Sequence, residues 1–169
     1  AYHHRKKQRP RRGPHLISST DNTAVVFGHT APRKAHRLSG TGMNILIVDD
    51  SDSSRLLLST ILKGAGYVDP LCAGSAGEAL TLLDERCQGG EAPDIDLILM
   101  DVVMPDMDGI DATRLIKADP RLRDIPIIIV TVKDEAASLE RAFEAGARDV
   151  VAKPVNSMEL RARVRSALR

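Results

Sequence analysis

The pattern of apolar and polar residues divides the chain into two parts. Residues 1–42 show no helical or strand period and are interrupted by proline and glycine at seven positions: Pro10, Gly13, Pro14, Gly28, Pro32, Gly40 and Gly42. From residue 44 onward, short apolar runs alternate with segments of helical period. We therefore expect a folded domain at 43–169, and we expect 1–42 to be disordered because it holds too little apolar surface to offset its chain entropy.

Three continuous apolar runs predict buried strands at 44–48, 95–100 and 127–130. Each is rich in Ile, Leu or Val and is flanked by polar residues, which is typical of strands that are covered on both faces. Weaker strands are expected around 67–72 and 150–152.

Segments with apolar residues at i, i+3, i+4 and i+7 lie between these runs and predict amphipathic helices. Their apolar positions are Leu58, Ile61, Leu62 and Ala65; Ala76, Ala79, Leu80 and Leu83; Leu139, Ala142 and Phe143; and Leu160, Val164 and Leu168. A further helix should follow Gly109. Ser75 and Glu78 form a capping box for the helix at 76–83, and Asn156 should cap the last helix. Five alternating strand–helix units predict an α/β, doubly wound parallel sheet with helices on both faces.

Composition adds limits on location and partners. The chain is 43% hydrophobic and 28% charged, as expected of a soluble globular protein, and it has two Phe, two Tyr and no Trp. An aliphatic core is therefore expected, and aromatic surfaces for stacking bases are not. No apolar stretch approaches the roughly 20 residues needed to cross a bilayer, and no secretion signal is visible, so we expect a cytoplasmic protein with no membrane partner. Cys72 and Cys87 lack nearby partners and are predicted to be reduced thiols.

Charge separates the same two parts. Residues 1–42 carry nine Lys or Arg and one Asp, a net charge of +8, whereas 43–169 carry 15 bases and 22 acids, a net charge of −7. The basic leader has two interpretations: a flexible arm that binds nucleic acid through phosphate contacts, or a solvated tail that is an upstream-translated leader or an expression remnant. We favour the second, with Met43 as a native start.

Polar residues follow four of the predicted strands. The first run ends in Asp49 and Asp50, the second long run in Asp101, the third in Thr131, and the last strand in Lys153. Because the carboxyl ends of parallel strands lie along one edge of a sheet, these side chains are expected to converge. Each residue alone is more often a cap, a turn residue or a surface charge, so only their joint placement favours a functional site.

Three crowded carboxylates repel one another unless a cation lies among them. Oxygen ligands suit Mg²⁺, which is often completed by a phosphate oxygen. Lys153 and Thr131 would then hold the oxygens of a transferred phosphoryl group, and Asp101 is the candidate nucleophile, since carboxylates form aspartyl phosphates.

Two other interpretations of the acidic residues fit the sequence less well. A phosphatase of the haloacid dehalogenase type would use Asp50-Ser51-Asp52 as its nucleophile motif, but no second acidic pair ends a late strand and no cap insertion is visible. A calcium loop built on Asp106, Asp108 and Asp111 would place Met and Leu at its first and last ligand positions, so these acids are expected to start a helix or face solvent.

Four motifs together resemble the receiver domain of bacterial two-component response regulators. They are ILIVDDSDSSR at 45–55, LILMDVVMPDMDG at 97–109, IPIIIVTVKD at 125–134 and AGARDVVAKP at 145–154. The resemblance covers 43–169 and implies a flavodoxin-like, five-stranded sheet in the order 2-1-3-4-5. It also implies a phosphorylation-dependent signalling switch rather than an enzyme with a separate substrate.

The resemblance assigns roles to individual residues. It makes Asp101 the phosphoacceptor, and it makes Asp49, Asp50, Asp101 and the backbone carbonyl of Val103 the ligands of Mg²⁺. Thr131 matches the switch hydroxyl. Lys153 matches the lysine that pairs with the phosphoryl group, and the Lys153–Pro154 bond is cis in the family.

The resemblance also implies partners. The phosphoryl donor would be a histidine kinase or a phosphotransfer protein. An output domain or target protein would bind through the fourth helix, fifth strand and fifth helix, and a second copy of the chain is an alternative partner.

The family pattern is broken at one switch position. The aromatic switch residue common in the family falls at Val150, so inward rotation of a Tyr or Phe cannot carry the signal. Separately, Val103 and Lys133 lie two residues beyond Asp101 and Thr131 and should flank the path of an attacking water. Because Val103 cannot hydrogen-bond that water, we expect slow loss of phosphate.

Overall fold

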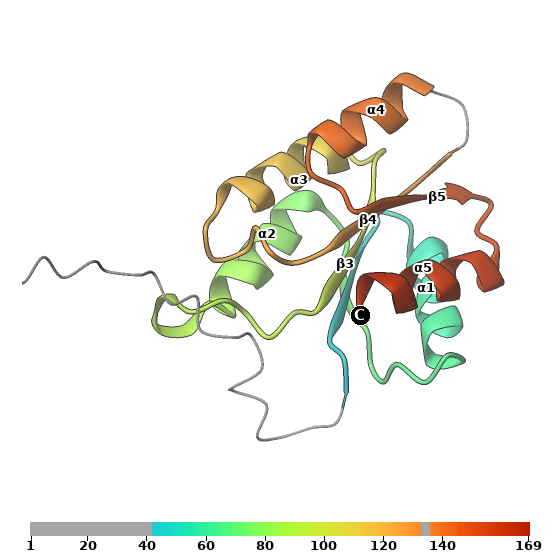
Figure 1. The fold of residues 1–169 in the computed structure, drawn as a ribbon, viewed down its shortest axis with the longest axis horizontal. Coiled ribbons are helices and arrows are strands. Elements are labelled where there is room, and N and C mark those ends of the chain that lie inside the picture. Colours follow the sequence, from blue (N-terminus) through green and yellow to red (C-terminus); the bar gives the residue numbers. More distant parts are fainter. Residues whose placement is uncertain (1–41, 133–135) are drawn as a thin grey trace, which may run out of the picture. The chain divides into compact units, whose positions relative to one another are not determined.

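The strands of the described residues form one parallel sheet in the order β2-β1-β3-β4-β5. Figure 1 labels three of them, β3, β4 and β5. A computed structural model describes residues 42–132 and 136–169, so the predictions for residues 1–41 and for Lys133 lie outside the described residues. The strands are β1 (Ile45–Val48), β2 (Leu71–Ala73), β3 (Leu97–Asp101), β4 (Ile127–Val132) and β5 (Asp149–Lys153). The predicted fold class and strand order are confirmed.

Helices cover both faces of the sheet. They are α1 (Asp52–Lys63), α2 (Ala76–Glu85), α3 (Gly109–Ala118), α4 (Ala136–Glu144) and α5 (Ser157–Ala167), with a short 3-10 turn, η1, at Gln88–Gly90. In Figure 1, α2, α3 and α4 lie on one face and α1 and α5 on the other. Two separate apolar clusters correspond to these two faces.

The core is aliphatic, as the composition predicts. Alternate residues of β1 belong to different clusters, because neighbouring side chains of a strand point to opposite faces. Ile45 and Ile47 pack with the residues of α1 and α5, whereas Leu46 and Val48 pack with those of α2, α3 and α4. All four are at most 1% exposed, which explains why this strand reads as a continuous apolar run.

Both predicted helix caps are present. The Ser75 Oγ accepts a hydrogen bond from the Glu78 backbone N–H at 3.1 Å, and the Asn156 Oδ1 accepts from the backbone N–H groups of Met158 and Glu159. The Glu78 carboxylate reaches one residue further back than a capping box requires, accepting from the backbone N–H of Gly74 at 2.7 Å.

Some local predictions were wrong. The strand expected at 67–72 is only Leu71–Ala73, because Val68 is exposed, Asp69 has a φ of 45° and Pro70 has no N–H to pair. Ala65 lies beyond the end of α1 and is exposed.

Cys72 and Cys87 are free thiols, as predicted. Within the described residues, none of the helices has the length and apolar character needed to cross a membrane.

Candidate functional site

Asp49 follows the last residue of β1 and is buried, with 1% of its surface exposed. One carboxylate oxygen, Oδ1, accepts a hydrogen bond from the Ser51 backbone N–H at 2.9 Å. The other, Oδ2, accepts from the Lys153 Nζ at 2.8 Å. The backbone N–H of Asp49 donates to the Ala73 carbonyl, which ties the end of β1 to β2. Both the backbone and the side chain of Asp49 are therefore held in place.

Asp101 is the last residue of β3 and is 5% exposed. Its Oδ1 accepts a hydrogen bond from the Lys153 Nζ at 3.0 Å. Gly109, the first residue of α3, packs directly on the Asp101 backbone: a Cβ at position 109 would lie 1.8 Å from the Asp101 carbonyl oxygen. The Gly109 N–H also donates to the Val102 carbonyl at 2.9 Å. The approach of α3 to the end of β3 therefore requires glycine at this position.

Lys153 ends β5 and bridges the two buried acids, Asp49 and Asp101. The bond that follows it, Lys153–Pro154, is cis, as the resemblance implied. The ammonium thus joins residues from three strands that are 52 and 104 positions apart in the sequence. The predicted convergence of these strand ends is observed.

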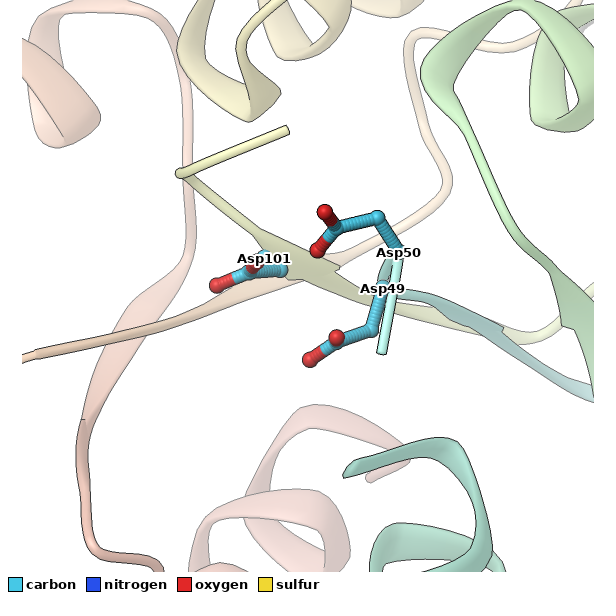
Figure 2. A group of neighbouring side chains, drawn as sticks. All are labelled: Asp49, Asp50 and Asp101. Atoms are coloured by element: carbon cyan, nitrogen blue, oxygen red, sulfur yellow. The ribbon is translucent and has the colours of Figure 1, made fainter. Parts of the chain in front are cut away.

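Asp50 completes the acidic group. Ligand atoms of Asp49, Asp50 and Asp101 all lie within 4.8 Å of one another. Figure 2 shows the three side chains gathered in one region, two from the end of β1 and one from the end of β3. Asp50 is exposed, and among the described residues no hydrogen bond or ion pair holds its carboxylate. One acid of the three therefore faces solvent while two are buried.

The electrostatics of the site follow from burial and from this bridge. Burial raises the pKa of Asp101 above its ordinary value, the hydrogen bond and charge of Lys153 oppose this, and the charges of Asp49 and Asp50 add to it. Burial alone would lower the pKa of Lys153, but its hydrogen bonds to Asp49 and Asp101 outweigh burial and raise it. Three carboxylates and one ammonium leave a formal charge of −2 when all are ionised. This balance favours a divalent cation.

Thr131 and Val103 lie at the same edge of the sheet. Thr131 follows Val130, which is aligned with Asp101, and is itself aligned with Ala152, next to Lys153. Among the described residues, no hydrogen bond links its side chain to the acidic group. Val103 lies in the loop between β3 and α3 and is 65% exposed.

The acids of the rejected interpretations have ordinary structural roles. Asp108 caps α3, accepting from the Asp111 N–H at 2.8 Å, and Asp106 is exposed with a φ of 67°. Asp52 is the first residue of α1, where it forms an ion pair with Arg55. The Asp52 side chain is 95% exposed, and the acids whose ligand atoms cluster at the strand ends are Asp49, Asp50 and Asp101, not Asp52.

Two contacts at the site go beyond the sequence predictions. The sequence predicts only a helix start at Gly109 and no role for Arg55, whose Nη1 donates to the Asp49 carbonyl at 2.6 Å. Arg55 lies within the first of the four motifs, one helical turn from Asp52, which is the signal that could have identified it.

Comparison with known proteins gives the family of the chain. A family model described as the response regulator receiver domain matches residues 45–165. The chain belongs to the response regulator receiver family. The receiver is 38% identical over 125 residues to the DNA-binding response regulator MtrA of Mycolicibacterium smegmatis, covering 74% of this chain and 50% of MtrA. It is 32% identical to the chemotaxis protein CheY1 of Helicobacter pylori, covering 75% of this chain and 97% of CheY1.

Solved structures show the same fold. The signal receiver domain of a histidine kinase from Syntrophus aciditrophicus is 35% identical, with a TM-score of 0.65 over 75% of this chain and 90% of that one. The receiver domain of the sensor histidine kinase PA1611 of Pseudomonas aeruginosa is 28% identical, with a TM-score of 0.65 over 75% and 98%, and is described with a magnesium ion in its active-site cleft. The chain spans about half the length of the MtrA proteins that it matches. The family match makes the described domain a receiver domain of two-component systems.

Proposed function

We propose that this receiver accepts a phosphoryl group on Asp101 from the phosphohistidine of a histidine kinase or phosphotransfer protein, with Mg²⁺ bound beside it. The observation that carries this proposal is the Lys153 ammonium, which contacts both Asp49 and Asp101 within a group of three carboxylates. A buried carboxylate with a cation beside it and acids around it has the parts that phosphoryl transfer requires.

The donor set fits Mg²⁺. Carboxylates and a backbone carbonyl are hard oxygen ligands, and the three acids are close enough to share one ion. We assign Asp49, Asp50, Asp101 and the carbonyl of Val103 as the protein ligands. When bound, Mg²⁺ would neutralise the acids and polarise the phosphoryl oxygens.

Each residue of the site then has a part in the transfer. An Asp101 carboxylate oxygen attacks phosphorus in line, a bond forms between that oxygen and phosphorus, and the bond from phosphorus to the histidine nitrogen breaks. Lys153 stabilises the charge that develops on the phosphoryl oxygens. Thr131 donates its hydroxyl to one of those oxygens.

The switch follows from a change in local charge. Phosphorylation of Asp101 makes the site more negative by about one unit. In this chain the usual aromatic is replaced by Val150, which is half-buried against the cluster on the α2–α4 face, so we propose that output passes through Thr131 and α4. The surface formed by α4, β5 and α5 would bind an output domain, a target protein or a second copy.

The other assignments from the sequence stay proposals. These are a receiver at 43–169, a basic leader at 1–42 that is separate from it, and a cytoplasmic location. Nucleic acid would be bound, if at all, through the leader, and salt-dependent binding measured with and without 1–42 would test that.

The test of phosphoryl transfer is direct. The chain is incubated with a small phosphodonor, with and without Mg²⁺, and its intact mass is measured. We expect the mass of one phosphoryl group to be added only to the wild type and only with Mg²⁺, and not to Asp101→Asn. Addition to Asp101→Asn at the same level, or turnover of a phosphate ester that needs Asp50 but not Asp101, would contradict the proposal.

A further inference from the structure

The peptide group between Asp49 and Asp50 is held by Arg55 of α1. The Arg55 Nη1 donates to the Asp49 carbonyl at 2.6 Å, and its Nη2 pairs with the Asp52 carboxylate. The guanidinium also lies close to Gly74, the residue after β2: a Cβ at position 74 would be 3.4 Å from Nη1. The Arg55 side chain is 21% exposed, so this contact is largely shielded from water.

This peptide group decides where Asp50 points. Neighbouring residues of a strand direct their side chains to opposite faces, so Asp49 and Asp50 can serve one site only if the chain turns between them. The Asp49 carbonyl belongs to the peptide group that makes this turn. A hydrogen bond to that carbonyl therefore fixes the plane that directs the Asp50 side chain.

The two acids differ in how firmly they are held. The Asp49 carboxylate accepts from Ser51 and Lys153, whereas no hydrogen bond or ion pair in the described part of the chain holds the exposed Asp50 carboxylate. The position of Asp50 thus depends on its backbone. Arg55 is the side chain that holds that backbone from the α1 side.

We propose that Arg55 is a positioning residue for the metal site: it orients Asp50 beside Asp49 and Asp101 so that the three can share one divalent cation. The inference rests on the proposed function, because it takes the acidic group to be a Mg²⁺ site. Residues that orient metal ligands without touching the metal typically contribute about 10- to 100-fold in affinity.

Replacement of Arg55 should change the Mg²⁺ affinity in one direction if the residue positions Asp50, and in the other if only its charge matters. Arg55 is a cation close to a site for a cation, so its charge alone weakens Mg²⁺ binding, and its removal would tighten binding. Loss of the hydrogen bond to the Asp49 carbonyl acts in the opposite direction. Only positioning predicts weaker binding in Arg55→Gln.

The experiment is a Mg²⁺ titration by isothermal calorimetry of wild type, Arg55→Gln and Arg55→Lys. We expect the dissociation constant to rise about tenfold or more in Arg55→Gln. Arg55→Lys keeps the charge but cannot form the two-pronged contact with the Asp49 carbonyl and Asp52, so it should also bind more weakly than wild type. It serves as the measured variant if Arg55→Gln does not fold.

Arg86→Gln is the matched control. Arg86 also pairs with an aspartate, Asp94, at 2.9 Å, but Asp94 contacts Asn44 at the opposite end of β1. This variant removes the same charge and should keep its Mg²⁺ affinity within about twofold of wild type, as expected for an exposed ion pair.

The outcomes separate the two proposals. If the wild type does not bind Mg²⁺, or if Asp50→Asn binds it as tightly as the wild type does, the metal site itself is wrong. If the wild type binds, Asp50→Asn does not, and folded Arg55 variants bind as tightly as the wild type or more tightly, only the role of Arg55 is overturned.

Discussion

Replacement of Gly109 by alanine tests how closely α3 must approach the end of β3. In an unconstrained helix the change would stabilise the protein by about 0.5–1 kcal/mol, because glycine loses more backbone entropy than alanine. Here the new Cβ would lie 1.8 Å from the Asp101 carbonyl oxygen and 2.9 Å from Cγ of Met100. Backbone and core must shift, and overpacking of this kind costs about 1–3 kcal/mol.

This clash decides whether Gly109→Ala stabilises or destabilises the protein. Because the nearest atom belongs to backbone rather than to a flexible side chain, we place its cost near the upper end of that range. The free energy of unfolding should then fall by about 2 kcal/mol in Gly109→Ala. The shift also moves Asp101, so phosphorylation should slow by about tenfold or more, as small displacements of reacting groups do.

Gly77 is the matched control. It is the second residue of α2, and a Cβ there would meet only the Ser75 Oγ, at 3.9 Å. Gly77→Ala should stabilise the chain by about 0.5–1 kcal/mol and leave phosphorylation unchanged. Urea unfolding followed by circular dichroism gives both free energies. If Gly109→Ala is as stable as Gly77→Ala, the close packing of α3 on Asp101 is wrong.

Three other changes test separate parts of the account. Val103→Asn should shorten the lifetime of phosphate on Asp101, because the amide can orient an attacking water; equal decay rates in a radiolabel assay would contradict this. Lys153→Met should slow phosphorylation by about 10²-fold, measured as the rate of mass gain, whereas an unchanged rate would remove the ammonium from the mechanism. The hydrogen bonds from Arg121 lower the pKa of Asp119, so this carboxylate stabilises the fold at neutral pH and that contribution is lost as the pH falls below about 4. Asp119→Asn should therefore lower the Tm more at pH 7 than at pH 3, and an equal decrease at both would be inconsistent with the ion pair.

Much of the fold could be predicted because strands that are buried on both faces of the sheet appear in the sequence as continuous apolar runs. The residues of β1, β3 and β4 are apolar at successive positions, and the predicted runs overlap all three strands. The edge strand β2 was placed too early, because only Ala73 of its three residues is buried and apolarity therefore carries little information there. In α4, Leu139 and Phe143 are about half exposed, so a helical period did not mean burial.

The candidate site was predictable to the level of strand ends. Parallel pairing brings the ends of β1, β3 and β5 together whatever the loops between them do. The individual contacts could not be predicted, because the spacing of residues along the sequence does not give the distances between side chains. The bridge of Lys153 to both Asp49 and Asp101 is one example. The contacts of Gly109 and Arg55 are also of this kind, because each is made to a backbone carbonyl rather than to a side chain.

The central claim is that one particular carboxylate of the three carries the phosphoryl group. The most direct measurement is reduction of the phosphorylated chain with borohydride, which converts an aspartyl phosphate to homoserine, followed by peptide mass mapping. The account predicts homoserine at position 101 alone, in samples treated with phosphodonor and Mg²⁺. Homoserine at position 49 or 50, or an unmodified position 101 in a chain that has gained phosphate, would contradict it.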